Sequence, residues 1–200
     1  MSLSLTWPTP LIGARVVVRP VETRDLPDLL VVNGNEEVTR YLPYATWSSM
    51  ADARAWLALA QAAQATGNTL QWVVVEKSTQ TVMGACLLFQ YDAASARAEL
   101  GYVLGRPWWG RGLMQDALTA VLDCAFSRLH LRRIEAEVDP RNVASGRLLK
   151  TLGFTSEGIL RERSITKGRA CDVESFGLLQ RDWITLKSRP FQESTIPLDT

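Results

Sequence analysis

The chain lacks an excess of charge of either sign, because its 200 residues include 22 Lys and Arg against 21 Asp and Glu. A net charge of +1 creates no long-range attraction to nucleic acid or an anionic membrane, so an anionic ligand must be held locally. Long apolar runs are also missing, since the longest, residues 82–89, is far shorter than the roughly 20 residues that span a bilayer. The amino terminus lacks the basic segment and cleavage site of a secretory signal. We therefore expect a cytoplasmic protein with no direct nucleic-acid or membrane partner.

Cysteine and histidine are scarce, with three cysteines and one histidine in the chain. Cys86, Cys124 and Cys171 are far apart and have apolar neighbours. This pattern is typical of reduced, packed thiols and gives neither a disulfide framework nor metal-ligand spacing. The sequence therefore predicts no metal site.

The order of the predicted elements indicates an α+β domain. No repeat, low-complexity tract or linker interrupts residues 1–187, so we predict one domain there and a tail over residues 188–200. A strand, a helix and a second strand follow one another over residues 97–138, and such a crossover makes the two strands parallel. Hydrophobic periodicity predicts strands at residues 15–19, 70–76, 81–90, 97–104 and 133–138, two more around a turn at 167–168, and helices from residue 23 and over 51–65, 113–129 and 143–152.

A glycine-containing turn between a predicted strand and helix is the first candidate binding site. Gly110 and Gly112 permit backbone conformations that a Cβ would forbid, so the turn can aim amides at a phosphate beside the helix. Arg111 adds a charge-assisted contact. Two glycines also end strands for structural reasons alone, so both interpretations stay open. The amides concerned are those of Trp109, Gly110, Arg111, Gly112, Leu113 and Met114.

Two other phosphate-loop motifs are absent from this turn. The kinase-type loop ends in Gly-Lys-Ser/Thr, and the dinucleotide fingerprint requires a third glycine where this chain has Gln115.

Residues 139–154 form the second candidate segment. Asn142 and Ser145 stand three residues apart at a predicted helix start, which is typical of an N-cap and its N3 position. The same pair also offers an amide that can bind a ligand and a hydroxyl that can protonate a leaving group. The two interpretations are compatible.

Five segments in this order resemble the GNAT superfamily of acyl-CoA-dependent N-acetyltransferases, specifically its RimJ/RimL-like branch. The superfamily's pyrophosphate motif is written R/Q-x-x-G-x-G, and its leading position here is Pro107, with Arg106 one residue earlier. The backbone amides that do most of the binding need no particular side chain. The segments are RVVVRPVETRDLPDLL, ELGYVL, WWGRGLMQDAL, NVASGRLLKTLGFTSEGILRE and KGRACDVESFGLLQRDW.

The resemblance implies a mixed, mostly antiparallel sheet with a central splayed parallel pair, flanked by helices. Acetyl-CoA would bind where that pair opens, along Tyr102, Val103 and Leu104. A backbone amide of Val103 or Leu104 would polarise the thioester, and the pantetheine would pair like an added strand. Asn142 would hold the pantetheine, and Ser145 would protonate the leaving thiolate.

Glu99 is the candidate general base for the acceptor amine, since it lies on the strand beside the expected cleft. An ordinary solvent-facing carboxylate is the alternative interpretation. Strand alternation places Tyr102 on the opposite face from Glu99. Glu174 and Asp172 are weaker candidates.

The acceptor pocket is expected between the loop at residues 37–47 and the turn near Lys167. Tyr41, Tyr44 and Trp47 are the predicted lining residues, and simple packing of these aromatic rings is the alternative. The resulting hypothesis is an acetyl-CoA-dependent N-acetyltransferase that acylates a primary amine, either a protein N-terminus such as that of a ribosomal protein or a small molecule. Use of another acyl-CoA such as succinyl-CoA, a non-catalytic CoA-binding module, and a monomer or homodimer remain open.

Overall fold

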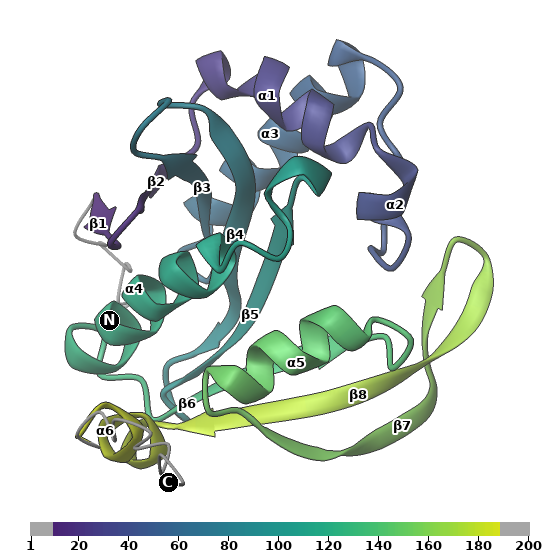
Figure 1. Cartoon of the computed structure of the whole chain (residues 1–200). Coiled ribbons are helices and arrows are strands. Elements are labelled where there is room, and N and C mark those ends of the chain that lie inside the picture. The colour runs from purple at the N-terminus through teal and green to yellow at the C-terminus, as the bar shows by residue number, and fades with distance from the viewer. Residues whose placement is uncertain (1–9, 189–200) are drawn as a thin grey trace, which may run out of the picture.

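The computed structural model describes residues 10–188 and contains one mixed sheet of eight strands in the order β1-β2-β3-β4-β5-β6-β8-β7 (Figure 1). The chain order is β1 (Leu11–Ile12), β2 (Val16–Pro20), η1 (Thr23–Asp25), α1 (Leu26–Asn33), α2 (Glu36–Thr39), α3 (Met50–Ala65), β3 (Leu70–Glu76), β4 (Val82–Asp92), β5 (Arg97–Leu104), η2 (Arg106–Trp108), α4 (Leu113–Ser127), β6 (Arg133–Val138), α5 (Val143–Thr151), β7 (Thr155–Thr166), β8 (Arg169–Leu179) and α6 (Gln180–Ser188).

All neighbouring strands are antiparallel except β5 and β6, which are parallel. The predicted fold class is therefore confirmed, and the bounds of β3, β5 and β6 agree with the prediction to the residue. The β7–β8 turn at Lys167 and Gly168 has positive φ at both residues, as a tight hairpin turn requires.

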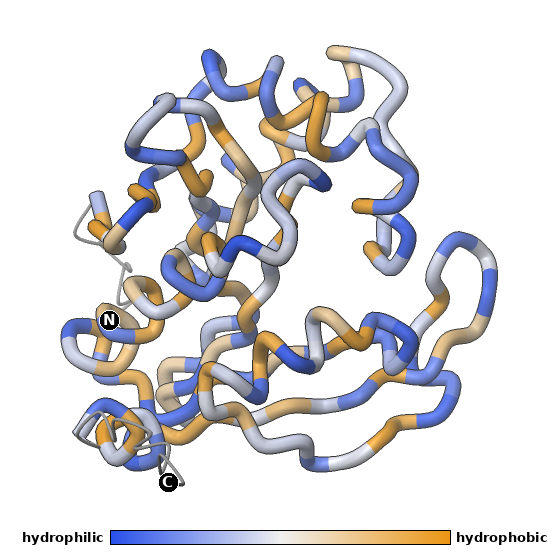
Figure 2. The backbone as a smooth tube through the Cα atoms, viewed as in Figure 1, coloured by the Kyte–Doolittle hydropathy of each residue, from blue (hydrophilic) through white to orange (hydrophobic). Residues whose placement is uncertain are grey.

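Helices cover both faces of the sheet, and strand alternation supplies a core on each side. In β3, Trp72 and Val74 pack toward α4 and α5, whereas Val73 and Val75 pack toward α1 and α3. Figure 2 shows hydrophobic segments along the strands that run between these helices. The helix layers thus bury both faces of the strands that lead to the splayed pair.

Two helix starts are capped by side chains, and the cap at Asn142 was predicted from the sequence. Ser49 and Asp52 form the capping box of α3, and Asn142 caps α5 by accepting a hydrogen bond from the Ser145 amide. The helix after the glycine turn is shorter than predicted, because it ends at Ser127 rather than residue 129.

Four elements of the described chain were not predicted from sequence, namely β1, α2, η2 and α6. The first two are too short for a periodic pattern to emerge. The expected tail begins at the end of α6, and residues 189–200 lie outside the described part of the chain. Within residues 10–188, no helix is long and apolar enough to cross a membrane, and no cluster of three or more His, Cys, Asp or Glu could hold a metal ion.

Candidate active site

The central parallel pair separates partway along its length. β5 and β6 are paired only from Arg97↔Arg133 to Glu99↔Glu135, although β5 continues to Leu104 and β6 to Val138. Parallel strands that stay in register would continue pairing to the end of the shorter one. The sheet therefore opens immediately after Glu99, with one free strand edge on each side of the opening.

Glu99 lies half-buried at the start of this opening, on the face away from α4 and α5. The pKa of its carboxyl is raised from the usual 4.5 to about 7, chiefly by burial and also by the nearby charges of Glu137 and Glu135, while Arg163 and Arg97 oppose the shift. A carboxyl with a pKa near 7 can accept a proton at neutral pH and release it again.

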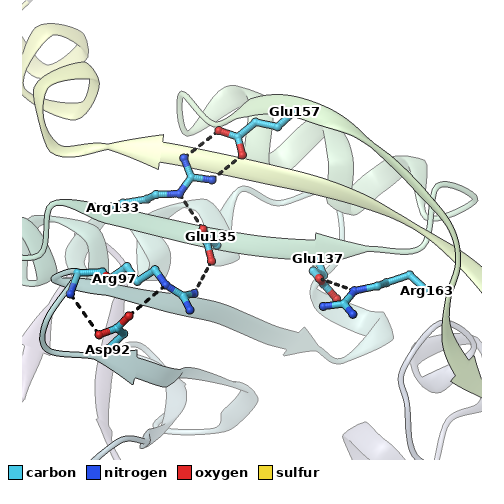
Figure 3. A network of polar contacts seen from close by, with 8 residues as sticks. Asp92, Arg97, Arg133, Glu135, Glu137, Glu157 and Arg163 are labelled. Atoms are coloured by element: carbon cyan, nitrogen blue, oxygen red, sulfur yellow. Dashed lines mark hydrogen bonds and ion pairs between the residues drawn. The ribbon is translucent and has the colours of Figure 1, made fainter.

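The other carboxylates on this face are engaged by arginines (Figure 3). Glu135 accepts hydrogen bonds from Arg97 at 2.7 Å and Arg133 at 2.8 Å, and Glu137 lies 3.6 Å from Arg163. Among the described residues, no cation lies within ion-pair distance of Glu99. Glu99 is thus the carboxylate at the opening whose lone pairs are not committed to an arginine.

The two weaker candidates for a base are held within the β7–β8 hairpin. Glu174 accepts a 2.6 Å hydrogen bond from the Ser156 hydroxyl, and Asp172 accepts one from the Glu162 amide. Both carboxylates therefore accept hydrogen bonds from within the hairpin.

Tyr102 and Ser145 meet on the opposite face of the opening. Their hydroxyl oxygens are 2.6 Å apart, and the Tyr102 hydroxyl also lies 3.3 Å from the Ser145 carbonyl oxygen. Burial raises the pKa of Tyr102 to about 12, so the phenol keeps its proton at neutral pH. The predicted separation of Glu99 and Tyr102 onto opposite faces is confirmed, and a donor pair from β5 and α5 lies across the sheet from Glu99.

Strand alternation distinguishes the two backbone amides considered for the thioester. The Gly105 amide donates to the Met83 carbonyl of β4, so two residues earlier the Val103 amide also points toward β4. The Leu104 amide therefore points away from β4, toward the opening. Of the two candidates, only Leu104 presents its amide to a ligand there.

The turn from β5 to α4 leaves backbone donors at a helix start. Gly110 and Gly112 have φ of +71° and +70°, a conformation that side chains disfavour, and within residues 10–188 no side chain caps the start of α4. A Cβ on Gly110 would have no described atom within 4 Å. The first amides of a helix have no partner within the helix and attract anions. The turn is therefore open and presents backbone donors that suit an anionic group.

The two arginines of the turn are paired with distant glutamates. Arg111 lies 3.1 Å from Glu76, and Arg106 lies 2.8 Å from Glu37 and stacks over Trp109. Trp109 in turn donates its indole N–H to the Leu104 carbonyl. Sequence reasoning did not identify a third cation here: Arg15, whose Nη2 would lie 3.1 Å from a Cβ built on Gly112.

At the expected acceptor pocket, residues from the first half of the chain contact residues from the second half. The Lys167 ammonium donates to the Thr39 carbonyl at 2.9 Å, and Arg141 lies over the ring of Tyr41 at 5.8 Å. Figure 1 shows the β7–β8 turn reaching toward α2. The structure thus joins the residue 37–47 loop to the turn near Lys167, as the sequence predicted.

The three predicted aromatic residues differ in their surroundings. Trp47 is only 8% exposed and packs in the core with Leu29 and Trp56. Tyr44 donates its hydroxyl to the Asn33 side chain, and burial raises its pKa. The structure therefore gives Trp47 and Tyr44 packing roles, and contact of either with an acceptor stays a prediction. The Tyr41 ring instead contacts Arg141, in the turn that precedes α5.

Comparison with known proteins gives a consistent family relationship. The profile of the family described as "Acetyltransferase (GNAT) domain" matches residues 15–155. The chain is 35% identical over 169 residues to the uncharacterized N-acetyltransferase p20 of Bacillus licheniformis, covering 84% of this chain and 95% of that protein. It is 39% identical over 84 residues to the ribosomal protein uS5-alanine N-acetyltransferase of Escherichia coli K12, covering 42% of this chain and 43% of that protein.

A solved structure shares the fold. Spermidine N-acetyltransferase from Vibrio cholerae, in complex with CoA and spermine, has a TM-score of 0.75 at 22% identity, covering 86% of this chain and 99% of that chain. Together with the family profile and the opened β5–β6 pair, these relationships identify the chain as an acyltransferase that belongs to the GNAT acetyltransferase family.

Proposed function

We propose that this enzyme transfers an acetyl group from acetyl-CoA to a primary amine, and that the amine is the α-amine of a protein or peptide. The observation that carries the proposal is the opening of β5 from β6 after Glu99, which leaves a carboxyl on one face and the Tyr102–Ser145 hydroxyls on the other. A direct transfer needs this separation, because the amine must lose a proton while the leaving thiolate gains one.

On the donor side, this chain's backbone would do most of the binding. The amides of residues 109–114 would hold the diphosphate at the start of α4, with Gly110 and Gly112 permitting its close approach. The Asn142 amide would bind the pantetheine arm, and the Leu104 amide would polarise the thioester carbonyl. The bound thioester supplies the activated acyl group, and the protein's part is orientation and charge stabilisation.

On the acceptor side, Glu99 would remove the proton. For an α-amine of pKa about 7.7 to 8.0, deprotonation at pH 7 costs about 1 to 1.4 kcal/mol, against nearly 5 for a lysine of pKa about 10.4. Glu99, with a pKa of about 7, matches the first task without a stronger base. This match favours an α-amine over a lysine side chain.

The proton transfers balance across the site. The ammonium first gives one proton to Glu99, which passes it to solvent. The neutral nitrogen then forms a bond to the acyl carbon as the carbon–sulfur bond breaks, and its second proton passes to the regenerated Glu99 carboxylate. The departing sulfur takes a proton from the Ser145 hydroxyl, which recovers one from the Tyr102 hydroxyl or from solvent. The products are an amide and a free thiol.

The charge around the expected acceptor entrance supports a peptide over a polyamine. Lys167 lies there and would repel a polycation, whereas the charge of Arg141 is paired with Asp139. The relative named for ribosomal protein uS5 acylation also points to a protein N-terminus. Spermidine is the second candidate, because the Vibrio cholerae structure is named for it.

The test combines a binding measurement with a transfer assay. Calorimetric titration with acetyl-CoA and succinyl-CoA measures donor choice, and release of free thiol measures transfer to peptides with N-terminal alanine or serine and to spermidine. We expect acetyl-CoA to bind more tightly and peptides to be the better acceptors. Tighter binding of succinyl-CoA would show that succinyl-CoA is the donor, and faster transfer to spermidine would show that the acceptor is a polyamine. Binding without transfer to any amine would show that the protein binds CoA without catalysis.

A further inference from the structure

The turn between β5 and α4, residues 105–112, is called the phosphate turn below. It has no cationic side chain that is free of an ion pair. The position that leads its motif is Pro107, and the two arginines in the turn, Arg106 and Arg111, are paired with Glu37 and Glu76. Either arginine would have to give up a carboxylate in order to bind a phosphate. A cation that binds a phosphate at this turn without breaking an ion pair must come from another part of the fold.

The turn between β1 and β2 is anchored directly on the first turn of α4. The Asp116 carboxylate accepts hydrogen bonds from the amides of Ala14 at 2.8 Å and Arg15 at 2.6 Å. Lys77 fixes the same turn from its other side, since its ammonium donates to the Gly13 and Ala14 carbonyls at 2.6 and 3.2 Å. The backbone of Arg15 is therefore held at the amino end of α4.

The Arg15 side chain extends from this anchor to the glycine turn. Its Nη2 would lie 3.1 Å from a Cβ built on Gly112, the residue that precedes α4. Arg15 is exposed, and within residues 10–188 its guanidinium has no hydrogen bond or ion pair. The Asp116 carboxylate in the first turn of α4 accepts its two hydrogen bonds from the Ala14 and Arg15 backbone amides and not from the Arg15 guanidinium. The local arrangement thus places one unengaged positive charge beside a set of amide donors.

We propose that Arg15 binds a phosphate of the acyl-CoA nucleotide and so supplies the charge that the motif position at Pro107 does not. A guanidinium forms charge-assisted, often bidentate hydrogen bonds with phosphate oxygens. This inference rests on the proposed use of acyl-CoA. It assigns to the β1–β2 turn the selection of a donor that carries the nucleotide over one that carries only the pantetheine arm.

The experiment measures the dissociation constants of the intact protein and its Arg15→Gln variant for CoA, for 3′-dephospho-CoA and for S-acetyl-pantetheine, by calorimetry and by competition. Arg15→Gln should weaken CoA binding about 10-fold, as expected for loss of one charge-assisted contact. An equal loss with 3′-dephospho-CoA assigns the contact to the diphosphate, and a loss with CoA alone assigns it to the 3′-phosphate. S-acetyl-pantetheine, which has no phosphate, should bind both proteins equally.

Matched variants separate this contact from general effects. Arg15→Lys should recover part of the affinity, and Arg54→Gln, which removes an exposed arginine of α3 on the other face of the sheet, should change nothing. Thermal unfolding of each free variant shows whether the anchor is intact. Equal CoA affinity for the wild type and Arg15→Gln would overturn the inference while leaving the proposed function standing. An equal loss for S-acetyl-pantetheine would also overturn it, and failure of the wild type to bind CoA would overturn both.

Discussion

The Tyr102 hydroxyl of β5 lies 2.6 Å from the Ser145 hydroxyl of α5, and this contact bridges the two elements on one face of the opened strand pair. The amide of Ser145 is fixed at the same time by the Asn142 side chain. Where the Tyr102 hydroxyl donates in this contact, the Ser145 oxygen is held in place and its own proton is left for the leaving sulfur, which is the property that a general acid needs.

Tyr102→Phe should lower kcat about 10-fold, because Ser145 loses the hydrogen bond that orients it. Ser145→Ala should lower kcat roughly 100-fold, and adding Tyr102→Phe to it should have little further effect. The measurement is a double-mutant cycle in kcat, with the KM for acetyl-CoA measured alongside. Tyr91→Phe, which removes a hydroxyl elsewhere against the same core, is the control. Multiplicative losses in the double variant would show that the two hydroxyls act independently.

The raised pKa of Glu99 predicts a specific pH profile. Below pH about 7 both Glu99 and the acceptor α-amine become protonated, so log kcat/KM of the wild type should fall with a slope approaching about 2. Glu99→Gln removes one of the two ionisations. Its rate should be roughly 100-fold lower at neutral pH, and its acid limb should have a slope of about 1. An unchanged profile would remove Glu99 from the mechanism.

Stability provides an independent readout of the same shift. Because the folded-state pKa is about 7 and the usual value is 4.5, the protonated carboxyl favours the folded state. That contribution is complete below pH 4.5 and is lost as the pH rises through 7. Glu99→Gln should therefore raise the Tm relative to the wild type above pH 8 but not near pH 4.5. The partial exposure of the carboxyl to solvent keeps the difference small.

The elements that frame the site could be predicted because their patterns are local. Alternation fixed the bounds of β5 and β6, and the three-residue spacing of Asn142 and Ser145 correctly indicated a capped helix. Contacts across the fold could not be predicted in this way. The Tyr102–Ser145 bond depends on how far α5 lies from β5, and Arg15 reaches α4 through a contact with Asp116 that joins residues 101 apart.

Whether an aromatic side chain is buried also could not be predicted from its neighbours in the sequence. An aromatic residue in a long loop can face a ligand or the core, and the sequence of the residue 37–47 loop contains no period that distinguishes the two. The structure distinguishes them through the neighbours of Trp47, which come from α1 and α3.

The two aromatic environments in that loop predict opposite responses to truncation. Trp47→Ala should cost about 3–5 kcal/mol of unfolding free energy, as large-to-small changes in a core do. Tyr41→Ala should cost much less stability and should raise the acceptor KM. Urea unfolding and steady-state kinetics of the two variants test this contrast. A stable Trp47→Ala protein with a raised acceptor KM would instead place that ring in the acceptor pocket.

The glycines of the phosphate turn allow a matched comparison. Gly110 and Gly67 both have positive φ, +71° and +79°, and a Cβ on either would have no described atom within 4 Å. Alanine at each position should therefore cost a similar 1–2 kcal/mol or so of backbone strain. Only Gly110→Ala should weaken CoA binding, because its Cβ would occupy the space that a diphosphate needs. Equal CoA affinities for the two variants would argue against phosphate binding at this turn.

The contact of Lys167 with α2 predicts an effect on the acceptor alone. Lys167→Met keeps the length of the side chain but removes the hydrogen bond to the Thr39 carbonyl, so the loop that carries Tyr41 loses its tether to the β7–β8 turn. The acceptor KM should rise about 5-fold, which corresponds to the loss of about 1 kcal/mol, while the affinity for CoA stays the same. Arg169→Met, which removes a charge from the same hairpin just beyond the turn, controls for the change in net charge. If both variants raise the acceptor KM equally, the charge of the hairpin rather than its contact with α2 governs acceptor binding.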